Sequence, residues 1–160
     1  MTEEGERALL TDYLATCGRL HAGFVQTVAL VEPLMPMTAA RIDQLPFEHD
    51  SYILGYLKRY EQFEDALHRT LKAISKIMEH GKIERLTSVD VTRRAYALGI
   101  LPNEKIWADA VRTRNALAHE YPLNPQKRTD QVNAAWNARE TLIETSTAIE
   151  RFVEQERLLA

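Results

Sequence analysis

The chain has 160 residues, 45% of them hydrophobic, which is enough for one folded core, so we expect a single domain over residues 1–160. With only 6 Gly and 6 Pro, the composition favours helices joined by short connections and argues against a β-sandwich. The formal net charge of −3 argues against a protein that coats nucleic acid over a broad surface, but it leaves room for a local cationic cleft.

The first residues and the one cysteine bear on compartment and on metal binding. Met1–Glu6 are acidic where a secretory signal is basic, and no apolar run approaches the roughly 18 residues of a membrane span. We therefore expect a cytoplasmic protein that does not engage a membrane. Cys17 supplies too few ligands for a structural zinc site, and the chain has no nucleotide-binding or zinc motif. We expect no metal, no cofactor and a core position for Cys17.

The first third of the chain is predicted to form a long helix and a short one. Apolar residues recur every three or four positions over Leu10–Val31, which predicts an amphipathic helix. Pro33 and Pro36 end it because proline lacks the amide donor and clashes with the preceding turn. Thr38 is then expected to cap a short helical turn through Leu45.

A second long helix is predicted to start near Glu48 or Asp50 and to end after Met78, with Gly81 as the left-handed residue past its last turn. Its aromatic residues are spaced for the core or a dimer interface rather than for stacking bases; they are Tyr52, Tyr56, Tyr60 and Phe63. On the same helix Glu64 and His68 are one turn apart, and we interpret them as an ordinary surface pair.

Three further helices complete the prediction. Ser88 is expected to cap a short one that ends at Gly99. The next opens at Pro102-Asn103 and ends near His119 or Glu120, because Tyr121-Pro122 disfavours helix. A last helix is predicted from Thr129 through Phe152. The sequence therefore predicts an all-α fold, an antiparallel bundle of four main helices plus a short one.

The segment whose side chains suit catalysis lies at the end of the penultimate predicted helix, the one that opens at Pro102-Asn103. Arg114 shares a stripe with Trp107, Val111 and Ala118, so it interrupts a face that is otherwise apolar or small and needs a partner. Asn115 and His119 are four residues apart on the neighbouring stripe, so the amide is placed to hydrogen-bond and orient the imidazole.

Arg114 and His119 are five residues apart, about 140° around an ideal helix, so one copy does not aim both at one point. Two copies related by a two-fold axis would bring each His119 toward the other chain's Arg114. Arginine is a fixed fork of donors for a phosphate, and histidine moves a proton near neutral pH. Together they suit RNA cleavage by the 2′-hydroxyl, with Arg114 stabilising the transition state, His119 as general acid or base, and no metal.

Plainer interpretations stay open at this point. The basic residues around the segment form either a focused RNA contact or merely a solvated face; they are Lys105, Arg112, Arg114, Lys127 and Arg128. An arginine five residues before a histidine is in itself common. His21, on the buried stripe of the first helix, reads as a core histidine rather than a ligand.

The stretch from Arg114 to Tyr121, RNALAHEY, resembles the Arg-x4-His-x-Tyr signature of HEPN proteins, particularly their HepT toxin branch. Asn115 directly after the arginine and the small or apolar run before the histidine are typical of that branch. The segment also lies near the end of a penultimate helix in a chain of fitting length.

This resemblance implies a homodimeric, metal-independent endoribonuclease toxin with a composite cleft, encoded beside a minimal nucleotidyltransferase antitoxin. It carries the catalytic roles to Arg114 and His119, and it makes Tyr121 the tyrosine that such antitoxins modify with AMP. Arg112, seven residues before His119, fits a looser family spacing and ranks second, as a residue that positions RNA phosphate. Pro122 restricts the backbone of Tyr121, so its side chain is expected near the mouth of the cleft.

Two rival hypotheses belong to other classes. One is a non-catalytic HEPN-type module that presents a nucleotide or macromolecule to a partner nucleotidyltransferase, and the other is a purely structural helical dimer. The sequence gives no means of separating them from the nuclease, because an inactive site can retain its motif.

Overall fold

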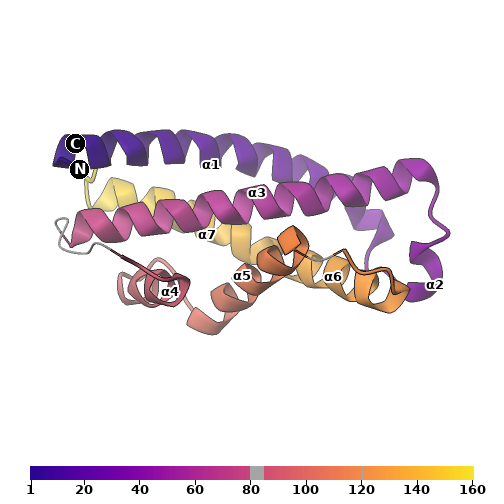
Figure 1. The fold of residues 1–160 in the computed structure, drawn as a ribbon. Coiled ribbons are helices and arrows are strands. Elements are labelled where there is room, and N and C mark those ends of the chain that lie inside the picture. The colour runs from indigo at the N-terminus through magenta and orange to yellow at the C-terminus, as the bar shows by residue number, and fades with distance from the viewer. Residues whose placement is uncertain (80–84, 120) are drawn as a thin grey trace.

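The computed structural model describes residues 1–79, 85–119 and 121–160, and in these ranges every regular element is helical (Figure 1). The all-α prediction is confirmed. Nowhere in the described ranges is a helix both long enough and apolar enough to cross a membrane. The elements are α1 (Glu3–Val31), the 3₁₀ turn η1 (Glu32–Leu34), α2 (Ala39–Ile42), α3 (Phe47–Met78), α4 (Ser88–Ala97), α5 (Glu104–His119), α6 (Pro125–Asn137) and α7 (Arg139–Gln155).

The two longest helices, α1 and α3, lie side by side in opposite directions, and α3 supplies more buried hydrophobic residues than any other described helix (Figure 1). Phe24 of α1 lies 5.4 Å from Tyr56 and 5.3 Å from Phe63, measured between ring centroids. Cys17 is buried, as predicted, and contacts the Thr70 hydroxyl at 3.2 Å. Tyr56, Tyr60 and Phe63 of the aromatic stripe are thus core, as the spacing predicts, whereas Tyr52 is only partly buried.

Buried tyrosine hydroxyls of α3 attach the C-terminal helices to this pair. Tyr60 donates to the carbonyl of Ala110 in α5 at 2.9 Å, and Tyr56 donates to that of Ala135 in α6 at 2.7 Å. A buried hydroxyl without a partner is costly, so these bonds fix where α5 and α6 sit on α3. In Figure 1, α5 runs obliquely up to the middle of α3.

The prediction of one last helix from Thr129 through Phe152 is wrong, because α6 and α7 are separate helices that meet at Ala138. The guanidinium of Arg139 lies 3.9 Å from the ring centroid of Trp136 and donates to its carbonyl at 2.8 Å. The break directs α6 onto α2 and α5 while α7 packs on α1 and α3.

Three predicted helix ends also need correction or comment. Thr87, not Ser88, caps α4, because its hydroxyl accepts from the Asp90 amide while the Asp90 carboxylate accepts from the Thr87 amide. Thr38 precedes α2 but makes no side-chain cap bond. Gly81, the predicted end of the second long helix, lies outside the described residues.

Candidate functional site

Helix α5 carries the predicted catalytic residues but turns them to different sides. Trp107 and Val111 are buried against the core, and Arg114 on the same stripe points to α3. Asn115 and His119 are exposed at the end of the helix. The stripe predicted from sequence is therefore correct up to Arg114. The offset between arginine and histidine persists in the folded chain.

The partner that Arg114 needs is Glu64, in the middle of α3. Nε of Arg114 donates to Oε2 of Glu64 at 2.7 Å, and the Glu64 side chain is 0% exposed while that of Arg114 is 21% exposed. Within the described residues the other carboxylate oxygen, Oε1, is buried without a hydrogen-bond partner. Burial raises the pKa of Glu64 to about 7, although Arg114 acts in the opposite direction.

His68 lies one turn further along α3 and faces Trp107 rather than Glu64. The indole Nε1 donates to Nδ1 of His68 at 3.4 Å, and the two rings are nearly parallel, with centroids 6.3 Å apart. Because the indole only donates, Nδ1 must be the unprotonated nitrogen. Burial, and then Arg114, lower the pKa of His68 to about 4, so this imidazole is neutral at physiological pH.

The interpretation of Glu64 and His68 as a surface pair is therefore wrong. Sequence reasoning missed Glu64 although a signal was present: it shares a three- and four-residue spacing with Tyr60, Leu67 and Leu71, all of them buried. A carboxylate and an arginine each carry a large desolvation cost when buried alone. Pairing the two charges offsets part of that cost.

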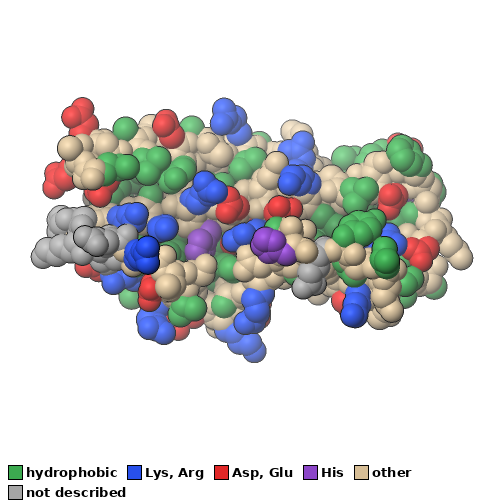
Figure 2. All heavy atoms as spheres, in the orientation of Figure 1, with side chains coloured by type: hydrophobic (Ala, Val, Ile, Leu, Met, Phe, Trp, Pro, Cys, Tyr) green, Lys and Arg blue, Asp and Glu red, His purple; other side chains and the backbone are tan. Residues whose placement is uncertain are grey.

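Asn115 and His119 do not form the predicted contact, since no hydrogen bond joins them within the described residues. Two of the other basic residues of this region are engaged by acids. Arg112 pairs with Asp109 on α5, and Arg128 pairs with Asp43 at 2.6 Å. Figure 2 accordingly shows basic and acidic side chains interleaved over α3, α4 and α5.

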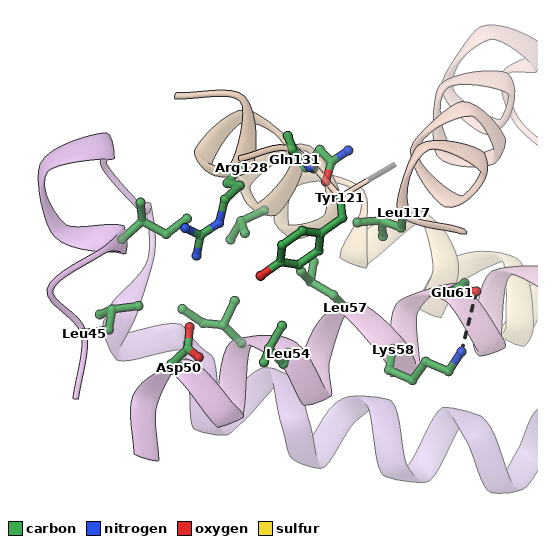
Figure 3. Close-up of a pocket in the computed structure, with 14 residues that line it drawn as sticks. Leu45, Asp50, Leu54, Leu57, Lys58, Glu61, Leu117, Tyr121, Arg128 and Gln131 are labelled. Carbon is green, nitrogen blue, oxygen red and sulfur yellow. Dashed lines mark ion pairs between the residues drawn. The ribbon is translucent and has the colours of Figure 1, made fainter. Parts of the chain in front are cut away.

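A groove opens beside the end of α5. It lies among α2, α3, α5 and α6 and has a volume of about 230 Å³. We call it the α5-end groove and define it by Asp50, Leu54, Leu57, Leu117, Tyr121 and Gln131. Figure 3 shows the Tyr121 ring projecting into it, above Leu57 of α3. Tyr121 is 74% exposed, which agrees with the expectation that it leaves the helix instead of continuing a buried stripe.

A scan of the sequence against family models finds no match, and neither curated proteins nor solved structures match the chain. Among the described residues, no group of three or more His, Cys, Asp and Glu side chains is arranged to hold a metal ion.

Proposed function

We propose that the protein is a cytoplasmic, metal-independent endoribonuclease toxin that acts as a homodimer, with Arg114 and His119 as its catalytic residues. The observation that carries the proposal is the Arg114–Glu64 pair. It fixes one edge of a guanidinium at 2.7 Å on a buried carboxylate, and the side chain keeps 21% exposure five residues before the exposed His119. The remaining donors of Arg114 are thus available to a phosphate, in a segment that resembles the HEPN signature.

The reaction is a transphosphorylation within the RNA strand. A base takes the proton of a 2′-hydroxyl, the 2′-oxygen attacks the adjacent phosphorus, and the bond from phosphorus to the 5′-oxygen breaks as that oxygen receives a proton. The products are a 2′,3′-cyclic phosphate and a free 5′-hydroxyl. His119 serves as general acid or base, and the remaining N–H donors of Arg114 stabilise charge on the non-bridging oxygens. Arg112 assists as a second phosphate contact when RNA displaces Asp109 from it.

The test is digestion of a mixed-sequence RNA by the purified protein in excess chelator, with analysis of the new ends. The wild type should cleave and leave cyclic phosphates. Arg114→Ala and His119→Ala should each lower the rate by about a hundredfold or more, the scale for losing an oxyanion stabiliser or a general acid. Arg151→Ala, an exposed arginine on α7, serves as the control and should cleave at the wild-type rate. Cleavage only with added magnesium, or equal rates in all four proteins, would refute the mechanism.

A minimal nucleotidyltransferase is the proposed antitoxin, and Tyr121 is its proposed target. The 74% exposure of Tyr121 supports access to its hydroxyl, and AMP there would add a bulky anion two residues from His119. Intact-mass analysis after co-expression with the neighbouring nucleotidyltransferase should show one added AMP on the wild type. Tyr121→Phe should stay unmodified and toxic. If the nucleotidyltransferase neutralises toxicity while Tyr121 stays unmodified, control by non-catalytic binding between the two proteins would be favoured instead.

A further inference from the structure

The α5-end groove has the composition of a site for one flat ring system with polar edges. Leu54, Leu57 and Leu117 supply apolar walls, and Tyr121 supplies an accessible aromatic ring. Its volume of about 230 Å³ is below the roughly 300 Å³ at which pockets begin to enclose drug-sized ligands. Double-stranded nucleic acid has no unstacked base to offer, whereas single-stranded RNA stacks its bases on such side chains.

The groove adjoins the part of α5 that carries Arg114. Its wall residue Leu117 is three positions after Arg114, a helical rise of about 4.5 Å, and lies about 60° from it around the helix. Only one sugar separates a base from its phosphate. A base held against Leu117 therefore leaves its own phosphate on the side of α5 that carries Arg114, and in the proposed dimer the other chain supplies His119.

Polar groups face the groove from two other helices. Figure 3 shows the Asp50 carboxylate on the α3 side, with the Tyr121 hydroxyl directed to the same space and Gln131 of α6 at the edge. The guanidinium of Arg128 also lines the groove, but Asp43 engages it at 2.6 Å. A carboxylate only accepts hydrogen bonds, so it favours bases that carry an amino group. Adenine, cytosine and guanine have such a group, and uracil does not.

We propose that the α5-end groove binds one unpaired, amino-bearing base of the RNA strand, next to the phosphate that is cleaved. This inference rests on the proposed nuclease function and adds to it a specificity site outside the Arg-x4-His motif. The alternative occupant is a second copy of the chain, since large exposed hydrophobic residues such as Phe47 and Leu123 lie on the flanks of the groove elements. Figure 2 shows hydrophobic side chains gathered at this end of the molecule.

The experiment measures binding of fluorescent octanucleotides of A, C or U, made with 2′-O-methyl sugars so that they cannot be cleaved. The wild type should bind A and C at least several-fold more tightly than U. Leu54→Glu should weaken binding of A and C by about tenfold or more, because it places a charge on the apolar wall. Leu30→Glu is the matched control, since Leu30 of α1 is 52% exposed against 51% for Leu54, and it should bind like the wild type.

Two further variants separate the outcomes. Asp50→Asn should reduce the preference for A and C over U, and Gln131→Ala should weaken binding without the added charge of Leu54→Glu.

Sedimentation of Leu54→Glu should match that of Leu30→Glu. A change in oligomeric state confined to Leu54→Glu would show that the groove is a subunit interface and overturn the proposal. If the wild type cleaves RNA and loses cleavage in Arg114→Ala, but Leu54→Glu cleaves and binds normally, the groove proposal fails while the nuclease stands. Failure of the wild type to bind any octanucleotide also overturns it.

Discussion

Glu64 is a costly residue to bury, and the cost is not recovered as stability. Its carboxylate is completely buried, and among the described residues one of its oxygens has no hydrogen-bond partner. Buried ion pairs contribute little net stability because desolvation offsets the attraction between the charges. The pair does restrict the guanidinium of Arg114 to one orientation, which is what a transition-state contact requires. We therefore interpret Glu64 as a residue that positions Arg114.

Glu64→Gln tests this interpretation. The amide oxygen can still accept from Arg114, so the fold should be retained, but the neutral partner should hold the guanidinium less firmly and slow cleavage by about tenfold. Burial raises the pKa of Glu64 to about 7, with Arg114 and Asp65 as the charged neighbours, so wild-type cleavage should gain a rising limb through that pH. A pH series of initial rates should lose this limb in Glu64→Gln. Asp65→Asn, at an exposed pair with Arg69, should keep it. An unchanged profile in Glu64→Gln would argue that Glu64 acts only through stability.

Glu64 and His68 should also give the stability an unusual pH dependence. The folded-state pKa of Glu64, about 7, exceeds its ordinary value of 4.5, so this group favours folding at low pH and loses that contribution as pH rises toward 7. The folded-state pKa of His68, about 4, is below its ordinary value of 6.5, so this group disfavours folding as pH falls below 6.5. The two slopes oppose each other between about pH 4.5 and 6.5.

Replacing His68 by Gln should expose the slope of Glu64. In the wild type, the opposing effects of these two groups should leave the urea midpoint nearly unchanged between pH 5 and 6.5. Those of His68→Gln should fall as pH rises over the same interval, because the opposing histidine is gone. Glu64→Gln should show the reverse trend, with midpoints that rise with pH. Parallel profiles in all three proteins would mean that neither side chain titrates in this range.

At the scale of helices, periodicity predicts what lies along one element and fails where two elements meet. The stripes of α1 and α3 and the end of α5 near His119 are encoded within a few residues, so they were predictable. The break at Ala138 is not, because its neighbours form an uninterrupted helical pattern and only packing on different helices separates α6 from α7. The Glu64–Arg114 pair joins positions 50 residues apart, and local spacing contains no information about which stripes face each other.

The start of α4 offers a sharp test at this scale, because two adjacent hydroxyl residues compete for the cap. Thr87 forms both bonds of a capping box with Asp90, whereas Ser88 is the first residue of the helix. Thr87→Ala should therefore lower the free energy of unfolding by about 1 kcal/mol. Ser88→Ala is the matched control and should change it by much less. Urea unfolding measures both, and a larger loss for Ser88→Ala would place the cap where the sequence alone suggested.

For the whole molecule, one copy of the chain provides a divided site. Arg114 is directed to α3 and anchored there, while His119 is exposed at the end of the same helix on a different side. In the proposed dimer, the His119 of one chain completes a site with the Arg114 of the other. Each site would then draw on both chains, and the two sites of a dimer would be chemically independent of each other.

Mixed dimers decide whether the site is shared. Arg114→Ala and His119→Ala chains carrying different affinity tags can be co-expressed and the mixed species purified through both tags. In a shared arrangement, the intact His119 of the first chain meets the intact Arg114 of the second, so one of the two sites is complete and the other lacks both groups. The mixed dimer should then cleave RNA at about half the wild-type rate, since one functional site of two remains.

If each site lies within one chain, both sites of the mixed dimer lack a group and its rate should equal those of the inactive parents. A chain that sediments as a monomer at the concentrations of the cleavage assay would contradict the shared site directly.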